Sequence, residues 1–414
     1  MKTLKKFAVM IVCAVLMCGC NTEEKDESMP DRLSKMRSGS VIPVQAESEE
    51  ESGYIPLNYD VQKGMWISYI DLAPMLEVDS DDEFRQNFTE VCENIVSLGC
   101  NTVYVHVRPF GDALYRSELY PTSSYVPLEN GQPLFDPLEI ICETAHNYEL
   151  SVHAWINPLR CQSESFFENI DDSFQTKEWY NENSDKIQSL ENSGNMWLNP
   201  AYPEVRSLIA EGAAEIAENY NIDGIHYDDY FYPTTEKSFD EQCYAQLAQG
   251  KSLSSWRFDN ISDMCSEIYS DVKNVDERIE VGISPQGNIE NNYDFMYADV
   301  RKWCKDEGYC DYILPQIYFG FNNSVKPFEQ TLQDWIDIAE QGDIKLVIGL
   351  GAYKIGEESE FTDSEGIIAQ QAEMALKKCQ GIALYTYNSL FVPDYELVNR
   401  TEAEIQYIAI ILGT

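Results

Sequence analysis

The sequence predicts an α/β fold in which eight parallel strands alternate with helices and close into a barrel. Three observations predict it: short β-rich runs recur along residues 54–414, helical patterns separate them, and eight such runs are present. Strict alternation of strands and helices is typical of parallel strands joined by right-handed crossovers. Eight units favour a closed (β/α)8 TIM barrel over an open doubly wound sheet. The absence of a glycine-rich phosphate loop after the first run points the same way.

The expected strands and helices follow one another in a regular order. The strands are Gly64–Ile70, Asn101–Arg108, Leu150–Ile156, Ile222–Asp228, Ile279–Ser284, Tyr312–Tyr318, Lys345–Leu350 and Ile382–Tyr387. The helices between them include Asp81–Leu98, Pro137–Tyr148, Pro203–Tyr220, Trp256–Val272, Phe328–Gln341 and Gly366–Lys378. In the first helix the apolar residues recur at helical spacing and should face the sheet. They are Phe84, Phe88, Val91, Ile95 and Leu98.

Residues 1–53 predict two segments that precede the barrel domain of residues 54–414. A basic start and an apolar run too short to span a bilayer indicate that residues 1–20 are a signal peptide. The run from Leu16 to Cys20 resembles a lipobox, which predicts lipidation of Cys20 and an extracytoplasmic, membrane-anchored protein. Cleavage at a nearby ordinary site is the alternative. Residues 21–53 are acidic and poor in aromatic residues, which predicts a disordered tether.

Charge and cysteine content exclude some classes of partner and chemistry. The formal net charge is −42, so phosphate backbones would be repelled and we expect no nucleic-acid partner. The twelve cysteines are scattered and form no CxxC pair. Removal of Cys13 and Cys18 with the signal and lipidation of Cys20 would leave an odd number, which favours mostly buried, reduced thiols. A bond between Cys304 and Cys310 stays open as an alternative.

The loops after the second, third and fourth strands are long and rich in Tyr, Phe, Ser and Asn. They span residues 109–135, 157–201 and 229–255. In barrels of this type the chemistry lies at the carboxyl ends of the strands and in the loops that follow them. Long aromatic loops over a barrel mouth suit an extended ligand with apolar faces and many hydroxyls. This pattern predicts a carbohydrate chain as the ligand.

The end of the fourth strand carries the strongest candidate for catalysis. Alternation places Gly224, His226 and Asp228 on one face of this strand and the residues between them on the other. Glycoside hydrolysis needs an ionised carboxylate near the anomeric carbon and a protonated acid beside the leaving oxygen. Asp228 suits the ionised role if His226 or a neighbouring donor stabilises its charge. Asp229 would bind sugar hydroxyls or brace the loop, and capping of the next loop is the structural alternative for Asp228.

The second carboxyl group is not fixed by the sequence. The fifth strand ends in Ser284–Asn288 without a carboxylate. Candidates for the proton donor come from several different loops, and they are Asp112, Asp229, Asp240 and Asp299. We favour Asp112 because its loop should overhang the site. A turn-stabilising role beside Gly111 is equally compatible with the sequence.

Three histidines near the ends of the second, third and fourth strands provide a rival interpretation. His106, His153 and His226, with an aspartate, have the composition of a zinc site, and a metal-dependent carbohydrate hydrolase or deacetylase is therefore a second hypothesis. Sugar sites also use histidine to bind hydroxyls, and we expect no metal and no other cofactor. The three histidines are therefore assigned to substrate binding.

Aromatic, amide and arginine side chains near the strand ends complete the expected carbohydrate site. Aromatic faces stack on the apolar faces of sugars, although each ring can equally pack at the top of the barrel. The aromatic candidates are Trp155, Tyr230, Tyr318, Tyr353 and Tyr387. Asn157 and Gln316 would supply amide hydrogen bonds. Arg108 would hold an anionic group, such as the lactyl carboxylate of muramic acid, or pair with Asp112.

Several segments in order resemble the glycosyl-hydrolase-like 10 family. They are Gly64–Ile67, Asn101–Pro109, Gly111–Tyr115, His153–Pro158, Trp197–Pro200, Asp223–Pro233, Gly282–Pro285 and Pro315–Tyr318. The resemblance implies a barrel glycosidase with a strand-four aspartate, here Asp228, as nucleophile. Members are often lipoproteins, and some are linked to cleavage of peptidoglycan glycan strands stripped of their peptides. A non-catalytic carbohydrate-binding lipoprotein is the third hypothesis, because the strand-five acid is missing.

Overall fold

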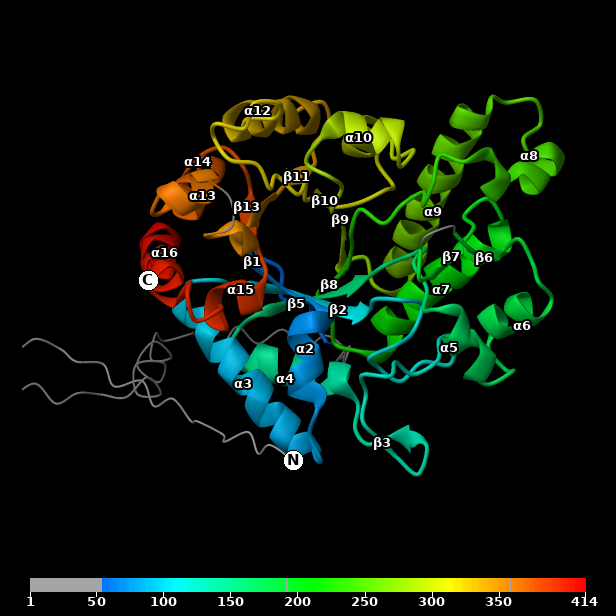
Figure 1. Ribbon diagram of the computed structural model, residues 1–414, viewed down its shortest axis with the longest axis horizontal. Coiled ribbons are helices and arrows are strands. Elements are labelled where there is room, and N and C mark those ends of the chain that lie inside the picture. The colour runs from blue at the N-terminus through cyan, green and yellow to red at the C-terminus, as the bar shows by residue number, and fades with distance from the viewer. Residues whose placement is uncertain (1–53, 191–192, 357–358) are drawn as a thin grey trace, which may run out of the picture. The chain divides into compact units, whose positions relative to one another are not determined.

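A parallel β-sheet forms the centre of the structure and closes on itself to make a barrel (Figure 1). Its strands are β1 (Gln62–Ile67), β2 (Thr102–Arg108), β5 (Ser151–Ile156), β8 (Gly224–Tyr227), β9 (Glu280–Ile283), β10 (Tyr312–Ile313), β11 (Lys345–Leu346), β12 (Ile348–Gly351) and β13 (Gly381–Tyr385). Closure depends on residues 345–351, because β11 pairs with β10 while β12 pairs with β13, which pairs with β1. Since β11 and β12 together form one unit, the predicted (β/α)8 TIM barrel is confirmed.

The computed structural model describes residues 54–190, 193–356 and 359–414. Residues Tyr54–Thr414 form one compact unit. The predicted signal peptide, the lipidated Cys20 and the acidic tether lie outside the described residues and stay predictions. Within the described ranges, no helix combines the length and the apolar character that a membrane crossing requires.

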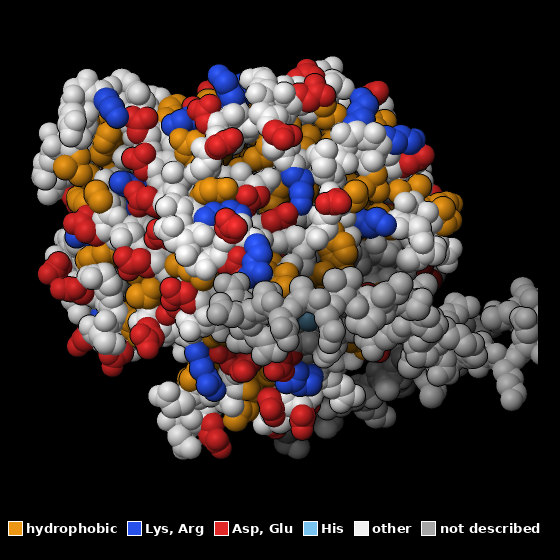
Figure 2. Space-filling model, turned by 180° about the vertical axis from the view of Figure 1, so that it is seen from behind, with side chains coloured by type: hydrophobic (Ala, Val, Ile, Leu, Met, Phe, Trp, Pro, Cys, Tyr) orange, Lys and Arg blue, Asp and Glu red, His pale blue; other side chains and the backbone are white. Residues whose placement is uncertain are grey.

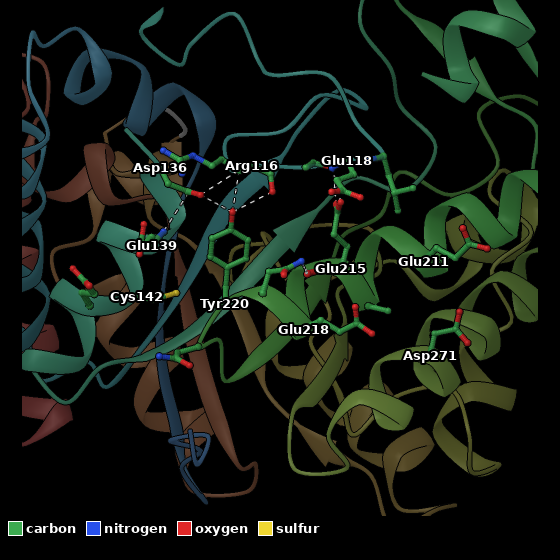
Figure 3. Close-up of a pocket in the computed structure, with 16 residues that line it drawn as sticks. Arg116, Glu118, Asp136, Glu139, Cys142, Glu211, Glu215, Glu218, Tyr220 and Asp271 are labelled. Atoms are coloured by element: carbon green, nitrogen blue, oxygen red, sulfur yellow. Dashed lines mark hydrogen bonds between the residues drawn. The ribbon is translucent and has the colours of Figure 1, made fainter. Parts of the chain in front are cut away.

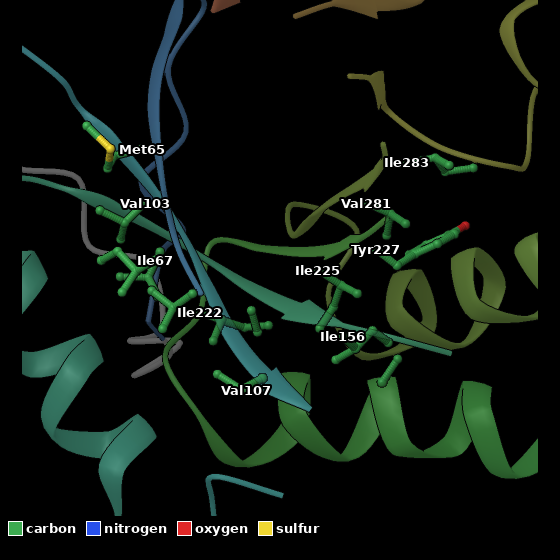
Figure 4. Close-up of a cluster of buried hydrophobic side chains, with 14 of the residues drawn as sticks. Met65, Ile67, Val103, Val107, Ile156, Ile222, Ile225, Tyr227, Val281 and Ile283 are labelled. Atoms are coloured by element: carbon green, nitrogen blue, oxygen red, sulfur yellow. The ribbon is translucent and has the colours of Figure 1, made fainter. Parts of the chain in front are cut away.

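The outward faces of the strands carry aliphatic side chains that pack under the surrounding helices (Figure 4). Alternation along each strand sends every second side chain to this layer. Val103 and Val107 of β2, Ile225 and Tyr227 of β8, and Val281 of β9 all belong to it and are almost fully buried. The barrel is therefore held by apolar burial between sheet and helices.

The inward faces fill the barrel mainly with aromatic and imidazole rings. This inner cluster comprises Trp66, Tyr104, Trp155, Tyr312, Leu314, Val347 and Ala383, with Tyr385 packed against it. Large rings need small neighbours, and Gly282 provides one: a Cβ atom there would lie 1.8 Å from the Tyr312 ring. Gly224 does the same beside His153, whose Nδ1 would lie 2.3 Å from an added Cβ atom. The interior is a packed core and not a pore.

The helices predicted between the strands are present with closely similar bounds. The long helices of the outer ring are α3 (Asp81–Ser97), α4 (Pro137–Asn147), α7 (Pro203–Asn219), α9 (Leu253–Val275), α12 (Phe328–Ala339), α14 (Ile367–Leu376) and α16 (Val398–Leu412). In α3 the side chains of Phe84, Phe88, Val91 and Ile95 are buried, as is the C-cap residue Leu98. The predicted apolar stripe is therefore confirmed.

Shorter elements occupy the loops between the units. They are the helices α2 (Tyr69–Leu76), α5 (Glu164–Asn169), α6 (Gln175–Asn181), α8 (Glu241–Leu247), α10 (Ile289–Asp294), α11 (Val300–Lys305), α13 (Ser359–Asp363) and α15 (Tyr387–Phe391), the 3-10 turns η1 (Lys237–Phe239) and η2 (Ala352–Lys354), and the hairpin strands β3 (Leu128–Glu129), β4 (Gln132–Pro133), β6 (Ile187–Ser189) and β7 (Met196–Leu198). Both hairpins, the helices α5, α6 and α8 and the turn η1 fall in the three long loops that the sequence analysis singled out.

The first and sixth predicted strands end at least three residues earlier in the structure than in the prediction. The first ends at Ile67 because Ser68 caps α2: its hydroxyl accepts a hydrogen bond from the backbone N–H of Asp71, and the Asp71 carboxylate accepts one from the backbone N–H of Ser68. The sixth pairs regularly only over Tyr312–Ile313, because Pro315 lacks the N–H that would continue the ladder. Gln316 still bridges to Gln286 and Gly349.

The exterior is acidic and the cysteines are reduced. On the face shown in Figure 2, Asp and Glu side chains are spread over the visible surface with Lys and Arg between them. The free thiols among the described residues are those of Cys92, Cys100, Cys142, Cys161, Cys243, Cys265, Cys304, Cys310 and Cys379. The predicted reduced state is confirmed for these residues, and the alternative bond between Cys304 and Cys310 is absent.

Candidate active site

A cavity of about 400 Å³ opens at the carboxyl ends of the barrel strands. Its walls come from the ends of at least six strands or the residues just after them. The lining residues are Trp66, Ser68, Tyr69, Ile70, His106, Trp155, Arg160, Asp228, Asp229, Tyr230, Gln316, Tyr318, Tyr353 and Tyr385. Eight of these were predicted as site residues, namely His106, Trp155, Asp228, Asp229, Tyr230, Gln316, Tyr318 and Tyr353. We refer to this space as the mouth cavity.

Asp228 follows β8 directly and is only 4% exposed. Burial raises the pKa of its carboxyl well above the ordinary value, and the charge of Asp229 raises it further. The positive charge of Arg160 opposes both effects. Asp228 accepts a long hydrogen bond from the backbone N–H of Tyr230, at 3.4 Å, and its contact with the Trp155 side chain also lowers its pKa. Asp228 is therefore favoured in its protonated form.

Asp229 carries the other carboxyl group in the mouth cavity and accepts hydrogen bonds from two amide side chains. The Nε2 atom of Gln316 donates to its Oδ1 at 3.3 Å. Burial raises the pKa of Asp229, whereas hydrogen bonds from Gln286 and Gln316 and the charge of Arg160 lower it. The pKa of Asp228 is therefore raised well above its ordinary value by burial and by the neighbouring charge, whereas that of Asp229 is raised against the opposing effect of two amide donors.

His226 and His153 lie below the mouth cavity in a chain of hydrogen bonds. The indole N–H of Trp66 donates to Nε2 of His226 at 3.1 Å, so His226 Nδ1 donates to the Tyr312 hydroxyl at 3.0 Å. That hydroxyl then donates to His153 Nδ1 at 2.8 Å. Burial lowers the pKa of His226 well below the ordinary value and that of His153 to about 3, so both rings are neutral.

The expected support of Asp228 by His226 is therefore wrong. Both nitrogens of His226 are used by Trp66 and Tyr312, one layer beneath the aspartate. Neither His153 nor His226 lines the mouth cavity, although each faces the barrel interior as alternation predicts. Their assignment to substrate binding is replaced by a structural role in the core.

His106 does line the mouth cavity and has free hydrogen-bonding capacity. Its ring stacks on Trp155 with centroids 3.6 Å apart and planes within 9°. The side chain is almost fully buried, and neither ring nitrogen has a hydrogen-bond partner among the described residues. Burial lowers the pKa of His106 well below its usual value, so the ring is neutral. It can offer one donor and one acceptor to a ligand hydroxyl.

Tyrosines form much of the remaining wall. Tyr318 and Tyr385 are stacked with ring centroids 5.8 Å apart, and Tyr353 meets both edge-on. Tyr69, at the start of α2, packs against His106. Tyr230 is one of the two rings that enclose Arg160. Such a ring-lined, hydroxyl-bearing wall matches the mixed apolar and polar surface of a sugar.

Trp66, Tyr69, Arg160 and Tyr385 were missed by the sequence analysis. A signal existed for Tyr385, which shares the parity of the inward-facing positions of β13, and for Trp66, which lies in a predicted strand. The prediction that Tyr387 lines the site is wrong, because Tyr385 and not Tyr387 lines the mouth cavity. The chain enters α15 at Tyr387, which turns the side chain outward so that its hydroxyl accepts a hydrogen bond from Asn94 of α3 at 2.8 Å.

Asp112 was favoured as the proton donor, but it does not line the mouth cavity. Its side chain is fully buried and accepts hydrogen bonds from the backbone N–H of Phe110 at 3.2 Å and from Gln162 Nε2 at 3.0 Å. It thereby ties the loop after β2 to the loop after β5. Asn157, predicted to bind substrate, acts similarly by donating to the Pro109 carbonyl at 3.0 Å. Both residues position loops.

Arg108 lies outside the barrel and contacts neither the mouth cavity nor Asp112. A β-bulge between His106 and Arg108 breaks the alternation of β2, so its side chain turns toward α7. There its guanidinium lies 4.2 Å from the centroid of the Tyr120 ring and donates to the Ile209 carbonyl. The predicted roles in anion binding and in pairing with Asp112 are both wrong.

The remaining acid candidates are structural. Asp240 is fully buried and forms an ion pair with Arg257 at 2.7 Å. Asp299 caps α11 by accepting a hydrogen bond from the backbone N–H of Lys302. Among the residues that line the mouth cavity, the carboxyl groups are those of Asp228 and Asp229.

A larger cavity of about 900 Å³ lies on the flank of the barrel, between α4 and α7 (Figure 3). Eight of its lining residues are acidic, against a single Arg116. Several of them are already bonded: the Tyr220 hydroxyl donates to Asp136 at 2.6 Å, and Ser117 donates to Glu215 at 2.5 Å. The flank cavity has no aromatic lining residue apart from Tyr220 and lies away from the strand ends. The mouth cavity is therefore the better candidate for catalysis.

The donor set for a metal is not assembled in the described parts of the chain. No group of three or more His, Cys, Asp and Glu side chains is placed there to hold a metal ion. Both ring nitrogens of His226 are hydrogen-bonded to Trp66 and Tyr312. The three histidines therefore do not form a common set of metal ligands.

A family model described as Glycosyl hydrolase-like 10 matches residues 62–365. The chain belongs to this family. Glycosyl hydrolase DigH of Escherichia coli K12 is 28% identical over 443 aligned positions, covering 98% of this chain and 96% of that protein. Glycosyl hydrolase YngK of Bacillus subtilis strain 168 is 28% identical over 347 positions, covering 76% of this chain and 67% of that protein.

Solved structures agree on the fold of this Glycosyl hydrolase-like 10 protein. The PgaB (BpsB) glycoside hydrolase domain from Bordetella bronchiseptica matches with a TM-score of 0.57 at 11% identity, covering 84% of this chain and 99% of that one. An endo-1,4-beta-mannanase from Rhizomucor miehei matches with a TM-score of 0.53 at 12% identity, covering 85% and 94%. At these identities the likeness shows the barrel fold alone. Family membership supports glycosidase chemistry as the function class.

Proposed function

We propose that this protein hydrolyses O-glycosidic bonds in a polysaccharide that enters the mouth cavity. The observation that carries the proposal is the pair of carboxyl groups of Asp228 and Asp229, held in one ring-lined space at the end of β8. Their environments separate their proton affinities, which is how a site obtains an acid and a base from two carboxyl groups. The barrel mouth is also where the chemistry of this fold occurs.

We assign the proton donor to Asp228 and the ionised carboxylate to Asp229. This reverses the charge expected from the sequence for Asp228, because burial holds the proton there while Asp229 has two amide donors. In the first step Asp228 would protonate the leaving glycosidic oxygen as the bond to the anomeric carbon breaks. A strand-four aspartate would still be the nucleophile, but it would be Asp229. Water would then complete the hydrolysis, with Asp228 taking its proton.

A second mechanism follows from the position of the pair. Both carboxyl groups come from consecutive residues on one side of the mouth cavity, and none faces them from another lining residue. Some glycosidases use an acetamido group of the substrate itself as nucleophile. Asp229 would then orient that group instead of attacking. The two mechanisms differ on substrates without a 2-acetamido group, which the second cannot cleave.

Peptidoglycan glycan strands stripped of their peptides are the substrate that we propose to test first. Support comes from the family resemblance and from a wall of tyrosines suited to successive sugar rings. Glycan strands with and without stem peptides would be incubated with the protein, and their products analysed for new reducing ends. We expect cleavage of the peptide-free strands, and a loss of roughly 100-fold or more for Asp228→Asn.

Other outcomes of this experiment decide among the alternatives. Full cleavage by the Asp228→Asn variant would contradict the assignment of the acid. Binding of the glycan by both proteins, without turnover by either, would identify a carbohydrate-binding protein. Loss of acetyl groups from an intact strand would instead identify a deacetylase.

A further inference from the structure

Arg160 is the cationic side chain that lines the mouth cavity, four residues beyond the end of β5. Its guanidinium lies between two aromatic rings, with Cζ 4.4 Å from the centroid of Phe110 and 4.0 Å from that of Tyr230. Its Nε donates to the Pro109 carbonyl at 3.2 Å. The contacts with two rings and the hydrogen bond restrict the position of the group.

The guanidinium of Arg160 has no carboxylate partner in the described parts of the chain. Three of the described arginines are buried. Arg206 and Arg257 are paired with Glu267 at 2.9 Å and with Asp240 at 2.7 Å, whereas Arg108 lies against the Tyr120 ring and does not line the mouth cavity. The chain has 71 acidic residues against 29 basic ones, so partners are abundant. Arg160 nevertheless forms no ion pair with any described residue, and the hydrogen bond to Pro109 uses only one of its five N–H donors.

The loops that carry Arg160 are built to keep it at the mouth cavity. Asp112 holds Gln162, two residues further along the loop, at 3.0 Å. Asn157 and Arg160 both donate to the Pro109 carbonyl, which joins the loops after β2 and β5. The buried polar contacts of Asp112 and Asn157 thus serve to place a guanidinium beside Asp228 and Asp229.

We infer that Arg160 binds a carboxylate carried by the substrate sugar, an inference that rests on the proposed function. A pre-positioned, unpaired guanidinium matches the two oxygens of a carboxylate. Sugar hydroxyls, by contrast, are provided for by neutral groups such as His106 and Gln316. The carboxylate belongs either to the lactyl ether of a muramic-type sugar or to C6 of a uronic acid. In peptidoglycan the lactyl carboxylate is free only after removal of the peptide, which is attached there as an amide.

The test compares three glycans with the same sugar backbone. They are peptide-free peptidoglycan strands with free lactyl carboxylates, the same strands with these carboxylates converted to primary amides, and chitooligosaccharides, which lack the lactyl group. For the wild type we expect kcat/KM on the free-carboxylate strands to exceed that on the amidated strands by roughly 10- to 100-fold. Arg160→Gln should abolish this preference by slowing the first substrate more than the other two, because the effect of its charge on Asp228 and Asp229 is common to all three. Arg160→Lys should keep part of it, because it retains charge without the planar fork.

The control is Arg301→Gln, which removes an exposed arginine of α11 that stacks on Tyr293 of α10, outside the mouth cavity. It should leave all three rates unchanged. Equal losses on all three substrates in Arg160→Gln would overturn the inference, because the arginine would then act on Asp228 and not on the substrate. Absence of any preference in the wild type would overturn it as well.

A binding experiment separates this inference from the proposed function. Titration calorimetry with Asp228→Asn, alone and combined with Arg160→Gln, would measure affinity for the free and amidated strands and for an oligoglucuronide. Charge-dependent binding that needs Arg160 supports the inference even if the wild type hydrolyses nothing, and the preferred glycan identifies the source of the carboxylate. Equal binding of free and amidated strands, together with no binding of the oligoglucuronide, overturns it even if hydrolysis is observed.

Discussion

Burial of Asp228 makes an ionised carboxylate unfavourable at this position. Its pKa is raised above the unfolded value mainly by burial, so the folded chain binds more protons than the unfolded chain as pH rises past the ordinary range of a carboxyl group. The contribution of this group to stability is complete below its unfolded pKa and is lost as pH rises toward its folded pKa. At neutral pH the site therefore carries a cost in stability, as is usual for functional sites.

Asp228→Asn should consequently stabilise the protein at neutral pH, because an amide has no proton to lose. We expect a gain of roughly 0.5–2 kcal/mol at pH 7 that disappears near pH 3.5. Thermal unfolding of both proteins across this pH range provides the measurement. A variant that is less stable than the wild type at pH 7 would show that the carboxylate is ionised and well solvated there.

The identity of most mouth-cavity residues was predictable from strand alternation, but their depth was not. His106, Trp155 and Asp228 follow from inward positions of β2, β5 and β8. Parity places His226 on the same face but does not say that it lies a layer below Asp228, bonded to Trp66 and Tyr312. Arg108 was misplaced because a single bulge reverses parity.

At the scale of elements, the strands were predictable and the loops were not. Strands of a parallel barrel are buried on both faces and read as continuous apolar runs. The start of α2 was missed because the apolar residue Ile70 continues the run beyond Ser68, the first residue of the capping box. The position of Arg160 depends on contacts between two loops, made by Asp112 and Asn157. The residues that these contacts join are 50 and 48 residues apart in the sequence. No local pattern specifies such contacts.

The small residues of the barrel strands make room for rings from the neighbouring strands, and this packing can be tested. Gly282→Ala would place a Cβ atom 1.8 Å from the Tyr312 ring, which bonds both His153 and His226. We expect a loss of about 1–3 kcal/mol in the free energy of unfolding, measured by urea denaturation. Gly194→Ala is the matched control, because nothing lies within 4 Å of its added Cβ atom. Equal effects of the two substitutions would contradict the packing described for the barrel interior.

At the scale of the whole molecule, the acidic surface and the mouth cavity have different charge properties. The chain carries a net charge of −42, yet its mouth cavity holds an arginine without a carboxylate partner among the described residues, beside the carboxyl groups of Asp228 and Asp229. Long-range repulsion disfavours polyanions in general, whereas this cation gives a local site for one carboxylate. The barrel supplies rigid strand ends for the aspartates, and the long loops supply the arginine and several of the rings.

The most direct test of the central claim asks whether Asp228 donates a proton to the leaving group. Wild type and Asp228→Asn would be compared on a natural glycan and on a dinitrophenyl glycoside of the same sugar, whose leaving group needs no proton. We predict that the variant loses roughly 100- to 10,000-fold in kcat on the glycan but stays close to the wild type in cleaving the dinitrophenyl glycoside. Similar losses on both substrates, or full activity on both, would contradict the role assigned to Asp228.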